Sequence, residues 1–386
     1  MVCPRVLMIS GDFPPFMSGV GDYVDKLAAA LHEQGADVTV LTSASAPDPA
    51  DGKRGFRLSR IVDGWGMGNR KAIIDHCRQG YDVIHLQYPS VKYGKSLLIN
   101  VLPALLKLSG VHTRTLVTIH DFRVMRRRWR ARVAPTLWSV DGLIHVDEKD
   151  WPWIRRWGVS NGKPRAHIPI AANAQPVSVD AQSRKKWRAE LGLAEDETAV
   201  AFFGILYPHK GLGELVGAVQ DLRSQGRKVR LLVMGDFDRQ ADWRAPMERL
   251  LADPAVIWVQ GAPLDEVSRC LHAADLAALP FHSGASTNRG SLLSTLAHGL
   301  PTVTTNGPAT PPNFDKDFDV LLVPVQDRSA LAASIARLMD DPALRQQMHQ
   351  AGIARHRTWA AIASETLEFY ARLTDSGSIQ RVGAIA

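Results

Sequence analysis

Short apolar runs alternate with amphipathic helical patterns along almost the whole chain, and this alternation is the feature that most limits the fold. It is the pattern of βαβ units, in which helices join parallel strands and cover the sheet. Two such series are present, and 386 residues are enough for two domains. The pattern predicts strands at residues 5–10, 38–42, 56–62, 82–86, 116–120, 142–146 and 166–170, and then at residues 199–204, 229–235, 256–260, 276–280, 302–305 and 320–323.

The division between the two series is expected at residues 174–188, which are polar and rich in Ser, Gln, Arg and Lys. Such a composition is typical of a linker. We therefore expect one α/β domain over residues 1–178 and a second over residues 185–357.

The composition favours a globular protein, with 45% hydrophobic and 22% charged residues. The longest apolar stretch, residues 96–108, is interrupted by Asn100 and Pro103 and is shorter than the roughly 20 residues of a membrane-spanning helix. The first residues read as a strand and not as a signal peptide. The three cysteines are far apart, and no metal or disulfide spacing is visible, so a cytoplasmic protein is expected.

Positive charge is concentrated in the first half of the chain. The net charge is +7, and residues 1–180 hold 24 Lys and Arg against 16 Asp and Glu. Six arginines fall within residues 123–132, and three tryptophans with two arginines fall within residues 151–157. These stretches fit a peripheral contact with an anionic membrane, an acidic ligand, or a solvated basic face. Nucleic acid is not expected as a partner, because no nucleic-acid-binding fold accompanies the charge.

Ligands of parallel α/β sheets bind beyond the carboxyl ends of the strands, so the loops at those ends are the candidate sites. After the first strand, Ser18, Gly19 and Gly21 precede a predicted helix and could admit an oxyanion to backbone N–H groups. An ordinary turn is the alternative. His120 ends the fifth strand, where it could bond a ligand hydroxyl or have only a structural role.

Two loops of the second half carry cations among small residues. Gly204 and Lys210 lie in one loop, and a lysine there can neutralise a diphosphate. The other loop opens a helix and suits an anion or a sugar, because it combines a single arginine with small polar residues. Its residues are Ser286, Thr287, Asn288, Arg289, Gly290 and Ser291.

Together these motifs resemble family 4 of the GT-B glycosyltransferases. The resemblance runs along nearly the whole chain, from Pro-Pro-x-x-Ser-Gly-Val-Gly-x-Tyr at residues 14–23 and Thr-Ile-His-Asp at 118–121 to the Lys-Gly loop at 210–211 and the Ala-x-Gly-x-Pro turn at 297–301. It implies two Rossmann-like domains facing a central cleft, with a C-terminal helix over residues 358–375 that packs back on the first domain. It also implies transfer of a sugar, with retention, from a nucleoside-diphosphate sugar.

The resemblance assigns roles to individual residues. His120 matches the histidine that faces the donor sugar, and Lys210 matches the basic residue on the donor diphosphate. The family's Gly-Arg-Leu is replaced by Gly204, Ile205 and Leu206, and its paired glutamates by Ser286 and Ser294. Both serines are expected to be among the donor-binding residues. Either donor recognition has been rebuilt around Arg289, which makes His120, Lys210 and Arg289 the expected catalytic set, or catalysis has been lost.

The resemblance implies no cofactor and no metal. Two Asp-x-Asp sequences, at residues 236–238 and 317–319, lie outside any catalytic context. We expect a hexosyltransferase of glycan, glycolipid or natural-product glycoside synthesis, with a lipid-linked or acidic acceptor and a peripheral place at the inner face of the membrane. The alternatives are a sugar-nucleotide epimerase or phosphorylase on the same fold, and a non-catalytic nucleotide-sugar-binding protein.

Overall fold

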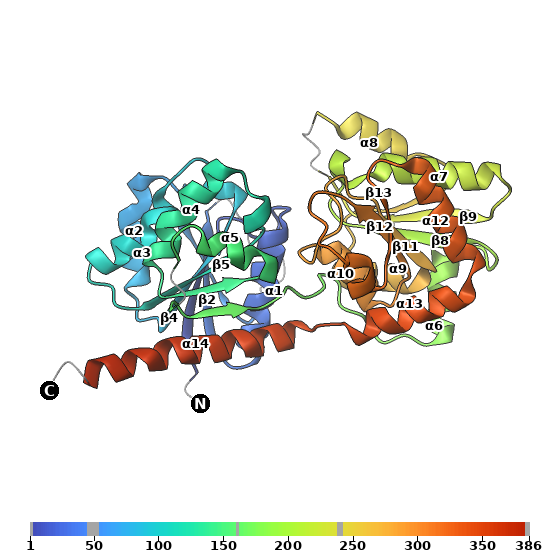
Figure 1. Ribbon diagram of the computed structural model, residues 1–386. Helices are drawn as coiled ribbons and strands as arrows, with labels where there is room; N and C mark the ends of the chain where they lie inside the picture. Colours follow the sequence, from blue (N-terminus) through green and yellow to red (C-terminus); the bar gives the residue numbers. More distant parts are fainter. Residues whose placement is uncertain (1–2, 45–53, 160–161, 238–241, 383–386) are drawn as a thin grey trace. The chain divides into compact units, whose positions relative to one another are not determined.

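The computed structural model describes residues 3–44, 54–159, 162–237 and 242–382. The chain forms two compact units (Figure 1). Unit 1 consists of Met1–Ile170 and Thr358–Ala386, and unit 2 consists of Ala171–Arg357. Each unit has its own parallel sheet with helices packed against it.

Unit 1 contains a seven-stranded parallel sheet in the order β3-β2-β1-β4-β5-β6-β7. The winding reverses between β1 and β4, the switch point beside which doubly wound sheets bind ligands. All six residues of β4 are buried, as expected for a strand covered on both faces. The strands are β1 (Arg5–Ile9), β2 (Asp37–Ser43), β3 (Arg57–Val62), β4 (Val83–Tyr88), β5 (Arg114–Ile119), β6 (Gly142–His145) and β7 (Arg165–His167).

The helices of unit 1 follow the apolar stripes of the sequence. In the first of them Val24, Leu27, Ala28 and Leu31 are all buried, which is the i, i+3, i+4, i+7 face of an amphipathic helix. The helices are α1 (Gly19–Glu33), α2 (Arg70–Cys77), α3 (Leu98–Leu108), α4 (Arg127–Ser139), α5 (Trp151–Arg155) and α14 (Trp359–Val382). Short 3₁₀ turns lie at Met67–Asn69, Val91–Tyr93, Phe122–Val124 and Glu148–Asp150.

Helix α14 packs on unit 1, although it follows the whole of unit 2 in the chain (Figure 1). It contacts α1, where the Gln34 side chain donates to the Ala360 carbonyl at 2.6 Å. A Cβ atom on Gly142 of β6 would lie 3.1 Å from Leu373 and 3.2 Å from Phe369. A glycine at this position therefore lets the helix approach the sheet closely.

Unit 2 contains a six-stranded parallel sheet in the order β10-β9-β8-β11-β12-β13. Counted from its own first strand this is 3-2-1-4-5-6, the Rossmann order that the first six strands of unit 1 also follow. The strands are β8 (Thr198–Phe203), β9 (Val229–Met234), β10 (Val256–Val259), β11 (Leu276–Leu279), β12 (Thr302–Asn306) and β13 (Leu321–Pro324). The helices are α6 (Ala181–Glu190), α7 (Leu212–Ser224), α8 (Arg244–Leu251), α9 (Leu264–Ala273), α10 (Gly290–Ala297), α11 (Phe314–Phe318), α12 (Arg328–Asp340) and α13 (Pro342–Ala354), with a 3₁₀ turn at Pro208–Lys210.

The predicted fold class, two Rossmann-like α/β sheets, is confirmed, and each predicted strand corresponds to one of the structure. The strand expected at residues 166–170 is shorter than predicted, because β7 ends at His167. The backbone N–H of Ile168 still bonds to the His145 carbonyl at 3.1 Å.

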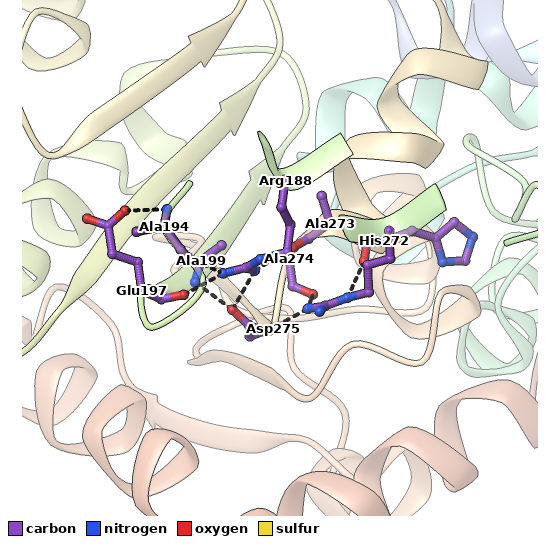
Figure 2. Close-up of polar contacts among 9 residues, drawn as sticks. Arg188, Ala194, Glu197, Ala199, His272, Ala273, Ala274 and Asp275 are labelled. Atoms are coloured by element: carbon purple, nitrogen blue, oxygen red, sulfur yellow. Dashed lines mark hydrogen bonds and ion pairs between the residues drawn. The ribbon is translucent and has the colours of Figure 1, made fainter. Parts of the chain in front are cut away.

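The prediction of a linker at residues 174–188 is wrong for its second half. Helix α6 begins within it, and Arg188 is only 8% exposed. The Arg188 guanidinium binds the Asp275 carboxylate at 3.0 Å and the Ala273 carbonyl at 2.8 Å (Figure 2). The same carboxylate accepts from the Ala199 N–H at 2.7 Å. The segment was predicted to be a linker because it is polar, and the partners that bury its arginine are remote in the chain.

Candidate active site

Glycines bring the loops of unit 2 together at the carboxyl ends of its strands. Gly235, after β9, has φ +151°, and a Cβ atom there would lie 2.0 Å from the Gly204 carbonyl oxygen. Gly211 has φ +78°, and its Cβ atom would lie 2.1 Å from the Pro280 carbonyl oxygen. Larger residues are excluded at both positions by backbone atoms and by the positive φ. The loops after β8, β9 and β11 therefore meet along one edge of the sheet.

Lys210 and Arg289, which are far apart in the sequence, lie over the same aromatic ring. The Lys210 Nζ atom is 5.0 Å from the centre of the Phe281 ring, and the Arg289 Cζ atom is 4.3 Å from it. The guanidinium donates to the Ser283 Oγ atom at 2.6 Å and to the Gly284 carbonyl at 3.2 Å. The loop thus fixes the arginine, and two positive charges share one apolar support.

Besides burial, the positive charge of this cluster contributes to a lowered pKa of a neighbouring histidine, His209. The pKa of His209 is lowered by burial and then by the charges of Lys210, Arg289 and His282. His282 lies close because its backbone N–H donates to the His209 carbonyl at 3.0 Å, and its ring bonds to the Glu214 carboxylate at 2.9 Å. Such an arrangement favours a ligand that carries two negative charges, such as a diphosphate.

The start of α10 supplies small groups beside these cations. Gly204 is close enough that a Cβ atom on it would lie 3.5 Å from the Ser291 Cβ atom. A Cβ atom on Gly290 would lie 2.5 Å from the Asn173 side-chain oxygen, so the helix begins in close contact with residues that follow the unit boundary. Arg289 is the N-cap residue, Thr287 and Asn288 are partly exposed, and Ser286 is 8% exposed.

Ser294 does not belong to this ligand-facing set, and its prediction as a donor-binding residue needs correction. The side chain is fully buried. Its hydroxyl donates to the Gly290 carbonyl at 2.7 Å and accepts from the Ala174 N–H at 3.0 Å. Both functions of the hydroxyl are used by the backbone, so Ser294 ties α10 to the segment around Ala174.

In unit 1, Asp12 organises the loops at the switch point between β1 and β4. Its buried carboxylate accepts from the Ser18 hydroxyl at 2.8 Å and from the Val91 and Lys92 N–H groups at 3.0 and 2.9 Å. Ser18 also caps α1. Sequence reasoning named the loop but missed the role of Asp12. The available signal was its position three residues after a buried strand.

The glycines of this loop differ in their surroundings. A Cβ atom on Gly21 would lie 3.2 Å from the Phe13 backbone nitrogen, whereas one on Gly19 would have no atom within 4 Å. Gly19 is also exposed. Gly21 therefore allows the loop to close, while Gly19 leaves the backbone at the start of α1 open to a ligand.

His120 follows β5 and is 6% exposed. Its Nε2 atom is 3.1 Å from the Gln87 Oε1 atom, and its ring meets the Tyr23 ring edge to face with centres 4.8 Å apart. Burial lowers the pKa of His120 to about 4. The ring is therefore neutral near pH 7 and can exchange hydrogen bonds with a hydroxyl without carrying a charge.

The basic stretches of unit 1 combine exposed arginines with tryptophans. Arg126, Arg127 and Arg128 are exposed at the start of α4. Beside them, Arg132 lies 4.4 Å from the centre of the Trp129 ring, and Arg130 lies 4.7 Å from the Trp153 ring of α5. Stacking of this kind holds arginines in place without neutralising them.

Within the described residues, no group of three or more His, Cys, Asp or Glu is arranged to hold a metal ion. Of the two Asp-x-Asp sequences, Asp238 lies outside the described residues. Asp319 forms an ion pair with Arg355 at 2.6 Å.

Among the helices that the structure describes, none is both long and apolar enough to cross a membrane.

Comparison with known proteins covers both units. Residues 183–355 match the family model described as Glycosyl transferases group 1, and residues 18–167 match the one described as Glycosyl transferase 4-like domain. A D-inositol 3-phosphate glycosyltransferase of Corynebacterium efficiens is 24% identical over 416 residues, which is 96% of each chain. A phosphatidyl-myo-inositol mannosyltransferase of Mycobacterium leprae is 24% identical over 407 residues, covering 100% of this chain and 99% of the relative.

Solved structures show the same fold. Sucrose-phosphate synthase from Thermosynechococcus elongatus superposes with a TM-score of 0.72 at 22% identity, over 97% of this chain and 100% of the other. HepE from Anabaena, in complex with UDP and glucose, gives a TM-score of 0.70 at 16% identity, over 97% and 99% of the two chains. With both units matched by family models, this chain belongs to family 4 of the GT-B glycosyltransferases, enzymes that transfer sugars from nucleotide-sugar donors with retention.

Proposed function

We propose that the donor diphosphate binds to unit 2 at Lys210 and Arg289, and that these cations stabilise the leaving nucleoside diphosphate. The observation that carries this proposal is their shared position over Phe281, at 5.0 and 4.3 Å from the ring centre. Preorganised cations are most effective where charge develops in the transition state. Gly204, the residues from Ser286 to Ser291 and the N-terminus of α10 add small side chains and backbone N–H groups around the donor.

Arg289 supports the hypothesis of a rebuilt donor site over that of lost catalysis. In this proposal, Ile205 takes the place of an arginine of the family, and Ser286 and Ser294 take the places of its glutamates, as the resemblance implies. The Arg289 side chain is held by Ser283 and Gly284, as expected for a residue that positions a fixed charge. Ser286 stays in the proposed donor set, and Ser294 is left out because its hydroxyl is used by the backbone.

Unit 1 supplies His120 and the loop of Ser18, Gly19 and Gly21 in this proposal. The neutral His120 ring bonds a hydroxyl of the transferred sugar near the reacting carbon. In the transfer, the bond between the anomeric carbon and the diphosphate oxygen breaks while the acceptor oxygen bonds to that carbon on the same face. The acceptor proton passes to the departing phosphate oxygen, so the proposed step requires no side-chain nucleophile and no metal.

We propose an acceptor that carries a phosphate or another acidic group and that is presented at a membrane. The relatives named above act, by their names, on inositol phosphate and on phosphatidyl-inositol. The exposed Arg126, Arg127 and Arg128 give unit 1 a face of the sign that such acceptors require. The proposed location is the cytoplasm, with peripheral contact at the inner face of the membrane.

The direct test measures which nucleotide the protein binds and what it does to the donor. A panel of nucleoside diphosphates and their sugars should contain one that raises the melting temperature, by mass action on the folded state. With the matching sugar, slow release of nucleoside diphosphate in water is expected of a transferase. Scrambling of the sugar without release would indicate an epimerase, and binding with neither reaction would indicate a binding protein.

A further inference from the structure

A chain of buried hydrogen bonds connects helix α14 to His120. The Tyr370 hydroxyl oxygen is 2.6 Å from the His85 Nδ1 atom. The His85 Nε2 atom is 2.7 Å from the Thr118 hydroxyl oxygen and 3.0 Å from the Gln87 Nε2 atom. The other end of the Gln87 amide, Oε1, is 3.1 Å from the His120 Nε2 atom.

The members of this chain are sealed from solvent. His85, Gln87 and Thr118 are fully buried, and Tyr370 is 1% exposed. Burial lowers the pKa of His85 to about 3, with a smaller effect from the charge of His120. Both imidazoles are therefore neutral near pH 7, and each holds one proton that can sit on either nitrogen.

The Gln87 amide couples the position of the proton on His85 to that of the proton on His120, because it bonds both rings. In the orientation that the structure gives this amide, its nitrogen donates to the His85 Nε2 atom, which places the His85 proton on Nδ1, facing the Tyr370 oxygen. Its oxygen accepts at the other end, so the His120 proton sits on Nε2. The His120 Nδ1 atom is then an acceptor, and no described residue forms a hydrogen bond with it.

We propose that Gln87, His85 and Tyr370 are positioning residues that hold His120 in the Nε2–H form, with Nδ1 left to accept a hydrogen bond from a hydroxyl of the bound donor sugar. Helix α14 is thereby part of the support of the active site. The sugar contact rests on the proposed function above, whereas the proton position is a property of the protein without ligand.

Two variants separate this arrangement from simple packing. Tyr370→Phe removes only the hydroxyl that faces the His85 Nδ1 atom. His85 should then move its proton to Nε2 and donate to Thr118, so the Gln87 amide turns over and His120 shifts toward the Nδ1–H form. Gln87→Glu replaces the donor by a second acceptor, so His85 should adopt the Nε2–H form while His120 keeps it.

The control is Thr366→Val, on the same helix. The Thr366 side chain is fully buried, and its hydroxyl donates at 2.7 Å to the Ile362 carbonyl of the helix itself. This variant removes a buried hydroxyl from α14 without touching the chain that leads to His120. It should leave both imidazoles as they are in the wild type.

The experiment is ¹⁵N–¹H correlation spectroscopy of the full chain with ¹⁵N-labelled histidine, with kcat and the donor KM measured on the same samples. We expect Nε2–H at His120 in the wild type, the shifts above in the variants, and a loss of about tenfold in kcat for Tyr370→Phe, by analogy with residues that orient metal-ligating histidines. Nδ1–H at His120 in the wild type, or a His120 signal unmoved by Tyr370→Phe, would overturn the proposal. If Tyr370→Phe does not fold, the Gln87→Glu spectra decide, and reversal at His85 alone supports it. A shifted proton with unchanged turnover would support the positioning chain and instead reject the role of His120 in the proposed function.

Discussion

Trp359 and Tyr23 meet edge to face, with ring centres 5.4 Å apart, although they come from opposite ends of the chain. Trp359 is the first residue of α14 and is 8% exposed. Tyr23 in turn contacts the His120 ring at 4.8 Å. The point at which the chain re-enters unit 1 is thus packed directly behind a residue of the candidate site.

The first prediction concerns this contact. Trp359→Ala should destabilise unit 1 by about 3 kcal/mol, because removing a buried tryptophan leaves a large cavity. Calorimetric unfolding of the variant should show a lower melting temperature for one transition. Trp138→Ala is the control, since Trp138 is 59% exposed and its loss should have a much smaller effect. Equal effects of the two changes would contradict the packing described for α14.

The second prediction concerns the cation pair on Phe281. Lys210→Ala and Arg289→Ala should each lower kcat by orders of magnitude, because loss of one charged transition-state contact typically costs about 3 kcal/mol or more. Steady-state kinetics with the identified donor provide the measurement. Arg227→Ala is the control. Arg227 lies just before the amino end of β9, whereas the proposed site lies at the carboxyl ends of the strands, and the Arg227 guanidinium binds Asp340. Near-normal kcat/KM in Arg289→Ala would rule out a rebuilt phosphate site.

The third prediction concerns the contact of His120 with the donor sugar. His120→Ala should retain binding of the free nucleoside diphosphate while turnover of its sugar falls, because only the sugar is proposed to touch the ring. Calorimetric binding of the diphosphate and initial rates with the sugar donor separate the two effects. Full activity of His120→Ala would reject the role proposed for this ring.

The fourth prediction follows from the lowered pKa of the same histidine. Burial depresses it from 6.5 to about 4, so the unfolded chain takes up a proton below pH 6.5 that the folded protein does not. Stability contributed by the neutral ring is therefore lost as the pH falls from 6.5 toward 4. Denaturant unfolding between pH 7 and pH 4 should show a shallower decline for His120→Asn than for the wild type. The same change at the exposed His112 serves as the control and should leave the slope as it is.

The fifth prediction concerns the basic face of unit 1. Arg126/Arg127/Arg128→Ala should weaken co-sedimentation with anionic vesicles, because each arginine near such a surface contributes about 1 kcal/mol. Binding should also fade at high salt, since exposed charges are screened over about 8 Å at physiological ionic strength. Lys185/Lys186/Arg227→Ala removes the same charge from unit 2 and is the matched control. Absence of binding at low salt would leave a soluble acidic acceptor as the remaining function of this face.

The sequence predicted the sheets well because apolar periodicity indicates which segments are buried. A short, largely apolar segment between two helical patterns, such as β4, is typical of a strand covered on both faces of a parallel sheet. It also placed Lys210 and Arg289 on loops at the correct ends of strands. It did not predict that both would lie over Phe281, because that contact joins loops from different strands. Only the three-dimensional sheet order brings them together.

Ser294 and Arg188 show where sequence reasoning failed. A small polar residue in a helix that follows a ligand-like loop suggests a ligand contact, but Ser294 lies four residues after Gly290 and its hydroxyl bonds back to that carbonyl. Arg188 looks like part of a polar linker until its partner Asp275 is known. In both cases the partner decides the role, and sequence patterns do not identify partners.

The return of α14 to unit 1 has a consequence for biosynthesis. The ribosome produces residues 171–357 before the helix that completes the first unit, so unit 2 can fold while unit 1 still lacks its last element. During that interval the His85 imidazole has no Tyr370 to bond, and the α1 surface that later receives Trp359 is exposed to other nascent chains. Unit 2 can therefore be complete first, and Tyr370 reaches His85 only after the C-terminal segment leaves the exit tunnel.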